Sequence, residues 1–183
     1  MTPEEEKRRK LLQLLLLKAI SDLRRNIGDV VKLKDDKDKM KVDIDMLKFT
    51  KKYRSFSLTN SQMKQVLGAI KTDILSRTPV DTRQLKNSIS TRVISANKGE
   101  VFIKGKRNNQ VANYQHHGTE AHYIAPKKEG GLLKWFYRGR WYSSHGHEVS
   151  GIIATEFFKP SAKVLTYVRN LIIGFIKVNL RNG

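Results

Sequence analysis

The chain has 183 residues, with 36 Lys and Arg against 17 Asp and Glu, a net charge of +19 and no cysteine. Its length fits one domain with an appended segment, its composition excludes a disordered chain, and the lack of cysteine excludes a disulfide framework or a thiolate metal site. Such a charge indicates a polyanionic partner: nucleic acid, an anionic membrane surface or an acidic protein. The charge is spread, since residues 1–58 already hold 16 Lys and Arg against 10 Asp and Glu. This distribution argues against a dedicated nucleic-acid-binding segment.

The first predicted element is a long helix. Thr2 can cap it, Pro3 suits its first position and Glu5 completes a capping box. The leucine run 11–17 is too short to span a bilayer and lacks a signal-peptide cleavage site, so we expect neither a membrane span nor a targeting segment. Its apolar stripe is wider than one core contact needs, which leaves two interpretations: a helix between two bodies or a central core helix. The apolar positions at helical spacing are Leu12, Leu15, Leu16, Ile20, Leu23, Ile27 and Val30.

Residues 32–58 differ in character from the first helix. The stretch KLKDDKDKMK has mixed charge and is typical of a solvated linker or a hairpin tip. Residues 41–49 alternate apolar and polar side chains, which predicts a weak, half-buried strand. We therefore predict two parts: an N-terminal helical arm with a linker and strand over 1–58, and an α+β domain over 59–183.

The second part begins with a helix whose capping box is formed by Thr59 and Gln62. Pro79 ends it, because the residue before a proline is pushed out of the helical region. Asp81 or Thr82 is then expected to cap a short turn through Leu85.

Two hairpins and a closing helix follow. The hairpins are predicted over 90–105, with a turn at 97–99, and over 131–144, with a turn at 138–140. Pro160 opens the last amphipathic helix. The order predicts an α+β fold: an antiparallel sheet packed against helices, with a long N-terminal helix and a C-terminal helix.

Aromatic side chains gather near the end of the chain. Trp135, with three further aromatic residues in the second hairpin, either covers the helix layer or forms an exposed patch for a neighbour. For Phe157 and Phe158, core packing beneath the last helix is favoured over an interface.

Three of the five histidines lie in YQHHGTEAHYIAP, residues 114–126, and the others are His145 and His147. A zinc site needs three or four ligands converging at about 2 Å, and nothing in the sequence brings the two groups together. We therefore expect no metal and no cofactor, and interpret the histidines as polar groups near a subunit boundary. Nucleophile-elbow, phosphate-loop and zinc-protease motifs are all missing, so we expect no enzyme.

Three stretches in order resemble the tail-completion or neck (head–tail joining) proteins of long-tailed bacteriophages, the family that includes the Z tail protein of lambda-like phages. They are RTPVDTRQLKNSI (77–89), YQHHGTEAHYIAPKKEGGLLKWF (114–136) and ATEFFKPSAKVL (154–165), and the resemblance covers roughly residues 60–180. The family's glycine after Asp-Thr is Arg83 here, so we expect the turn not to use a positive φ at that position. The residues that carry the resemblance are Pro79, Asp81, Thr82, Leu85, Tyr114, Gly118, Thr119, Pro126, Phe157, Phe158 and Pro160.

The resemblance implies a structural virion protein that is assembled in the host cytoplasm. It would form a homo-oligomeric ring, for which the family suggests six subunits, between the connector-side neck proteins and the tail tube. Genomic DNA would pass through its lumen without sequence-specific binding, and the residues above with Trp135 would form structural turns or subunit contacts. Two alternatives stay open: a tail terminator at the top of the tube, and a small basic nucleic-acid-binding protein.

Overall fold

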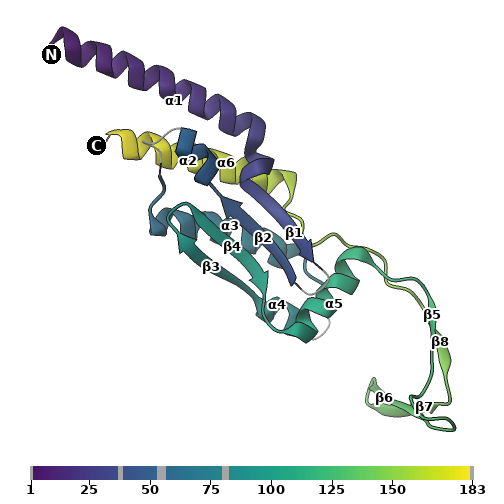
Figure 1. Ribbon diagram of the computed structural model, residues 1–183. Coiled ribbons are helices and arrows are strands. Elements are labelled where there is room, and N and C mark those ends of the chain that lie inside the picture. Colours follow the sequence, from purple (N-terminus) through teal and green to yellow (C-terminus); the bar gives the residue numbers. More distant parts are fainter. Residues whose placement is uncertain (1, 37–38, 53–56, 80–82, 182–183) are drawn as a thin grey trace. The chain divides into compact units, whose positions relative to one another are not determined.

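The computed structural model describes residues 2–36, 39–52, 57–79 and 83–181 (Figure 1). It divides into a main unit, residues 1–112 with 157–183, and a ribbon unit, Asn113–Glu156. The boundary predicted at residue 58 does not coincide with this division, because a strand from before it pairs with a strand from after it. The α+β fold class is confirmed.

Helix α1 (Pro3–Val30) begins as predicted. The Thr2 hydroxyl accepts a hydrogen bond from the Glu5 N–H, and the Glu5 carboxylate accepts one from the Thr2 N–H. Only its second half is packed: Ala19, Ile20 and Leu23 are buried there. Within the described residues, no helix is both long enough and apolar enough to cross a membrane.

A four-stranded antiparallel sheet forms the centre of the main unit. Its strands are β1 (Val31–Asp36), β2 (Lys39–Asp45), β3 (Ile89–Ser95) and β4 (Lys98–Ile103), in the order β1-β2-β4-β3. The hairpin predicted over 90–105 is therefore confirmed as β3 and β4, but its turn lies at 96–97 rather than at 97–99, because Lys98 already pairs with Ser95.

Two predictions for residues 32–49 were wrong in part. Residues 32–36 belong to β1 rather than to a linker, because β1 pairs along its whole length with β2 and its lysines face the solvent side. Of the two predicted alternatives the hairpin is the correct one, and its tip, residues 37–38, lies outside the described residues. The predicted strand 41–49 ends at Asp45, whose carboxylate accepts a hydrogen bond of 2.8 Å from the Leu47 N–H. Helix α2 (Leu47–Lys52) begins there.

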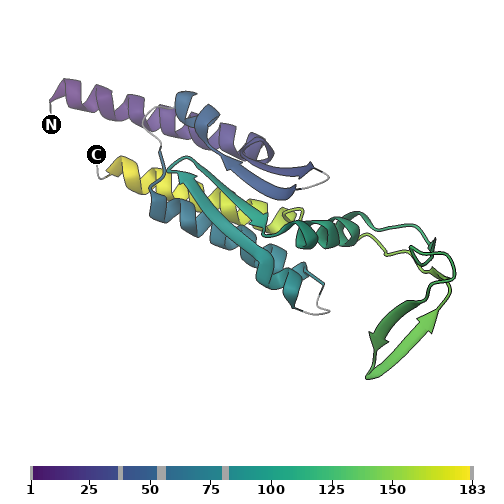
Figure 2. The ribbon, with the colours of Figure 1, turned by 60° about the horizontal axis from the view of Figure 1, so that its bottom comes forward.

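The core lies between one face of the sheet and the helices behind it (Figures 1 and 2). Helix α3 (Asn60–Arg77) packs on β3, β4 and α6, and helix α6 (Ala162–Arg181) also packs on α1. On the strands, buried side chains recur at a period of two residues, and on the helices they recur at a period of 3.6 residues. The two sets of buried side chains pack against each other, as the apolar pattern predicts. The fully buried side chains include Val42, Ile44, Val101, Met63, Val66, Ile70, Ile74, Val168, Ile172 and Ile176.

The α3-to-β3 connection contains a local departure from expectation. Helix α3 starts with the predicted Thr59–Gln62 capping box and ends at Arg77, before Pro79. The next helix, α4 (Gln84–Ser88), has Arg83 at its N-cap with φ 58° and no side-chain capping bond. The expectation that Arg83 avoids positive φ was wrong. Arg83 adopts the left-handed conformation, which is strained for a residue that carries a Cβ atom.

A segment between the sheet and the ribbon unit forms a helix that the sequence pattern did not predict, α5 (Lys106–His117). The buried Asn109 fixes its start. The Asn109 side-chain amide donates to the Ile103 and Gly105 carbonyl oxygens at 2.9 and 3.0 Å, and its oxygen accepts from the Met40 N–H at 3.0 Å. One side chain thus ties β2, β4 and α5 together.

The ribbon unit is a two-stranded antiparallel ladder in three stages. Thr119 bridges to Ile152, then β5 (His122–Ile124) pairs with β8 (His147–Val149), and finally β6 (Leu133–Tyr137) pairs with β7 (Arg140–Ser144). The hairpin predicted over 131–144 is confirmed, with Arg138 and Gly139 both at positive φ in its two-residue turn.

Candidate interaction surfaces

The residues that carry the resemblance fall into three structural settings. In the first, Pro79 follows the buried Thr78 at the end of α3, and Leu85 of α4 is part of the core. Asp81 and Thr82, the predicted caps, lie outside the described residues. What is described of this motif therefore has a packing role.

The second setting is the base of the ribbon. Tyr114 is exposed on α5, and Gly118 ends that helix at φ +77°. A Cβ at Gly118 would stand 2.5 Å from the Ile152 carbonyl oxygen, so only glycine lets the two ribbon strands approach. Thr119 accepts and donates backbone hydrogen bonds with Ile152 at 3.0 and 2.9 Å. Of the structural turns that the resemblance implies, Tyr114 does not lie in one, because it belongs to helix α5.

Pro126 is half-buried beyond β5. It lies where the chain leaves the β5–β8 pairing on its way to the β6–β7 hairpin. Pro126 thus lies between the two strand pairs of the ribbon.

In the third setting, Phe157 and Phe158 are fully buried and pack edge to face at 5.9 Å. Pro160 precedes Ser161, whose hydroxyl accepts from the Val164 N–H at the start of α6. The favoured core assignment of the two phenylalanines is confirmed.

The ribbon unit lacks a core of its own. Within it only His116 is buried, and every other side chain is half-buried or exposed. A two-stranded ribbon is at best marginally stable in water, because one layer has nothing to bury its apolar face against. The apolar side chains of this unit are therefore available to another surface.

The β6–β7 hairpin concentrates those apolar side chains. Trp135 pairs across the strands with Tyr142, and Phe136 with Trp141, at ring-centre distances of 5.8 and 5.4 Å. Neighbouring pairs point to opposite faces of the hairpin. Trp135 also contacts His147 at 4.8 Å, whereas Phe136 and Trp141 stay 60% and 74% exposed. The open question for this hairpin is answered in favour of an exposed aromatic patch.

A second uncovered apolar surface lies on the first half of α1, which we call the leucine segment. Its exposed members are Leu11, Leu12, Leu14, Leu15 and Leu17, and Leu14 is 65% exposed. Of the described residues before Lys18, only Leu16 is even half-buried. The structure thus excludes the central-core interpretation for this half of the helix and leaves a helix with an unmatched apolar surface.

The histidines outside α5 make local hydrogen bonds within the ribbon. The Nδ1 atoms of His122 and His145 lie 3.1 and 3.2 Å from the Glu120 and Gly131 carbonyl oxygens, and that of His147 lies 2.8 Å from the Ser144 hydroxyl. His122 and His147 stand at opposite ends of the β5–β8 pairing. The side chains of His122, His145 and His147 therefore make their hydrogen bonds within the ribbon unit.

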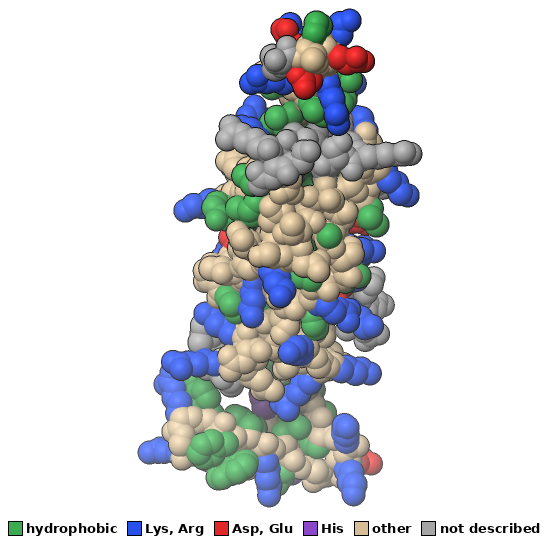
Figure 3. All heavy atoms as spheres, turned by 90° about the vertical axis from the view of Figure 1, so that its left-hand side faces the viewer, with side chains coloured by type: hydrophobic (Ala, Val, Ile, Leu, Met, Phe, Trp, Pro, Cys, Tyr) green, Lys and Arg blue, Asp and Glu red, His purple; other side chains and the backbone are tan. Residues whose placement is uncertain are grey.

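The sequence pattern missed one further feature, a charged open face on the sheet. Its residues come from β1, β2, β3 and β4, so no local window of sequence contains them. Only strand register reveals that Lys41 lies opposite Phe102, and Asp43 opposite Glu100. On the face of the molecule in Figure 3, Lys and Arg side chains are spread over most of the surface.

Fold and surfaces together define an α+β protein with two exposed apolar surfaces on separate segments. Comparison of the chain with models of known protein families, with curated proteins and with solved structures finds no match.

Proposed function

We propose that this chain is a structural, non-enzymatic subunit of a bacteriophage neck or tail that associates with copies of itself in a ring. One observation carries the proposal: the leucine segment of α1 and the aromatic β6–β7 hairpin are both exposed, and they belong to different segments of one chain. Monomeric soluble proteins rarely leave such contiguous apolar surfaces uncovered.

Two different apolar surfaces on one chain suit head-to-tail association. In such a contact, one patch of a subunit meets a different patch of the next, and the arrangement closes into a ring when the rotation allows. The ordered resemblance over roughly residues 60–180 supports a tail-completion or neck protein, with the tail terminator as the nearest alternative. Connector-side neck proteins and tail tube or terminator proteins are the other proposed partners.

The assignment to a virion is tested by composition. Purified particles of the phage that encodes this chain should contain it at a fixed, small number of copies, measured by quantitative mass spectrometry against the major tail protein. Gold labelling of a tagged chain should place it at the head–tail junction. Its absence from purified particles would overturn the assignment.

A further inference from the structure

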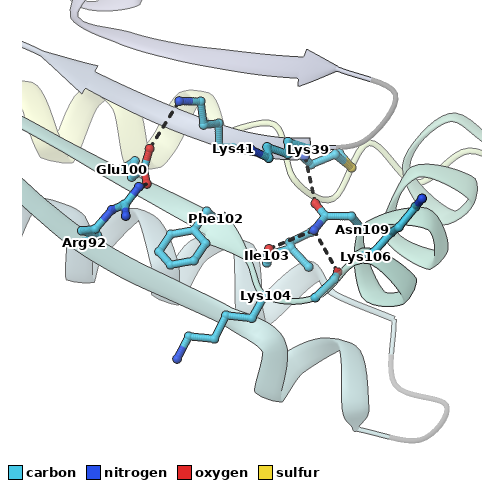
Figure 4. Close-up of a pocket in the computed structure, with 11 residues that line it drawn as sticks. Lys39, Lys41, Arg92, Glu100, Phe102, Ile103, Lys104, Lys106 and Asn109 are labelled. Atoms are coloured by element: carbon cyan, nitrogen blue, oxygen red, sulfur yellow. Dashed lines mark hydrogen bonds and ion pairs between the residues drawn. The ribbon is translucent and has the colours of Figure 1, made fainter.

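We infer that the open face of the four-stranded sheet, at its α5 end, is a binding groove for the phosphodiester backbone of nucleic acid. The groove is a cavity of about 630 Å³ in the main unit (Figure 4). Its walls come from β2, β3, β4 and the start of α5. Its charged lining residues are Lys39, Lys41, Arg92, Lys104, Lys106 and Glu100.

The acidic groups on this face are already neutralised by their neighbours. Glu100, whose side chain is buried, binds Arg92 at 2.5 Å and Lys41 at 3.3 Å. Asp43, directly opposite Glu100 on β2, binds Lys34 at 2.8 Å and Lys41 at 3.2 Å. Burial alone would raise the pKa of Asp43, but the two lysines outweigh it and hold the pKa below its usual value. The network thus has three cations for two carboxylates.

Further positive charge remains at the α5 end. Among the described residues, Lys104 and Lys106 form no ion pair, and both side chains are exposed at the rim. Helix α5 starts at Lys106, so the positive end of its dipole lies at the same place. Exposed amines without carboxylate partners are the groups that release counterions when they meet phosphates.

The floor of the groove is rigid and partly aromatic. Phe102 lies in the floor with the Arg92 guanidinium 5.6 Å from its ring centre. The three hydrogen bonds of Asn109 fix the β4–α5 corner against β2, as Figure 4 shows. The backbone positions that carry the cations are thus fixed relative to one another, which suits a regularly spaced polyanion such as a nucleic-acid backbone.

This inference rests on the proposed function for its choice of polyanion, since DNA is what would pass a neck ring. Binding at the groove can be measured without ring formation, because the groove and the apolar surfaces use different residues. The two can therefore fail separately: binding of DNA is measured on the groove variants, and assembly is measured on the surface variants.

The test compares two double variants of equal net charge. Lys104→Gln with Lys106→Gln removes the two rim cations, and Lys64→Gln with Lys177→Gln removes two exposed cations from α3 and α6. Binding of a fluorescein-labelled 20-base-pair duplex is followed by anisotropy between 50 and 200 mM NaCl. Each phosphate contact contributes about 0.9 to the slope of log affinity against log salt.

We expect the unaltered chain to bind the duplex and the rim variant to lose about two from that slope, with affinity at 100 mM NaCl reduced at least tenfold. The control variant should keep slope and affinity within about twofold. Equal behaviour of the two variants, or no binding by the unaltered chain at 50 mM NaCl, would overturn the groove. Equal competition by polyglutamate of the same charge would also overturn it, by reassigning the face to an acidic protein.

Discussion

The carboxylate of Asp73 joins two segments of the main unit. It accepts hydrogen bonds from the Ser161 N–H at 3.0 Å and the Ser161 hydroxyl at 2.6 Å, and it pairs with Arg77 at 2.6 Å. Arg77 in turn donates to the Lys159 carbonyl oxygen. The end of α3 is thereby fastened to the start of α6, next to the buried Phe157 and Phe158.

Asp73 should make stability depend on acid pH. Burial alone would raise its pKa, but the Ser161 hydrogen bonds and Arg77 outweigh burial and hold the pKa below its ordinary value. A carboxyl with a depressed folded-state pKa contributes stability above the unfolded pKa of about 3.9, and that contribution is lost as pH falls through the folded pKa. Asp73→Asn should cost about 1–3 kcal/mol at pH 7, and the difference from the unaltered chain should shrink below about pH 4.

Urea unfolding between pH 2.5 and 7 measures this difference. Asp29→Asn serves as the control, because Asp29 forms only an exposed ion pair with Lys32 at 3.5 Å and should change stability by less than about 0.5 kcal/mol. A constant gap between Asp73→Asn and the unaltered chain over the whole pH range would refute the role given to the charge.

The backbone conformation of Arg83 gives a second prediction about stability. It holds φ 58° at the N-cap of α4, a conformation that costs an L-residue about 1–2 kcal/mol and costs glycine little. Arg83→Gly should therefore raise the free energy of unfolding, by up to about 1 kcal/mol after the extra freedom of glycine in the unfolded chain is deducted. Thermal and urea unfolding would check this, and a clear loss of stability would show that the Arg83 side chain contributes packing that outweighs the strain.

At the scale of elements, local chemistry decided what the sequence could predict. Both capping boxes, the end of α3 before Pro79 and the two hairpins depend on residues within a few positions, and they are confirmed, although the turns lie at 96–97 and 138–139 rather than at 97–99 and 138–140. Helix α5 depends instead on Asn109 reaching Met40 across 69 positions, a contact that leaves no local signal, so this helix was missed. Strand β1 pairs with β2 in a local hairpin, but its charged side chains were interpreted as a linker or a hairpin tip rather than as a strand.

The same reason limits prediction of the candidate surfaces. The aromatic residues of the hairpin were visible in sequence, but their exposure depends on what else packs there. The groove on the sheet draws on four elements and was not predicted at all. The wide leucine stripe did indicate a contact beyond one core, and only its position on an unpacked half-helix required the structure.

The exposed aromatic side chains of the β6–β7 hairpin give a prediction about self-association. Phe136→Ser with Trp141→Ser should leave the main unit folded, with a melting temperature within about 3 °C, because neither side chain belongs to the core. Self-association should weaken at least 30-fold, since aromatic anchors at an interface are commonly worth 2 kcal/mol or more each. Sedimentation velocity measures association, and circular dichroism measures folding.

The matched control removes apolar surface of similar exposure elsewhere. Ile94→Ser with Tyr167→Ser alters β3 and α6 at side chains that are 50% and 56% exposed. This control should associate like the unaltered chain. If both double variants weaken association equally, the hairpin is not a specific contact.

The whole molecule combines an α+β core with two apolar surfaces that the chain itself does not cover. An isolated helix of a few turns and an isolated two-stranded ribbon are both marginal in water. The leucine segment and the ribbon unit are therefore expected to gain most of their order from a neighbour. Burial of apolar surface then supplies the association free energy, while the basic charge keeps unassembled subunits apart.

The most direct test is the mass of the purified full chain over a range of concentrations, by mass photometry and native mass spectrometry in 150 mM salt. We predict one closed species at an integral multiple of the 21.1 kDa subunit mass. This species should be ring-shaped in negative stain, and the double variant Leu11→Gln with Leu14→Gln should dissociate it. A chain that stays at the monomer mass from nanomolar to high micromolar concentration would contradict this prediction.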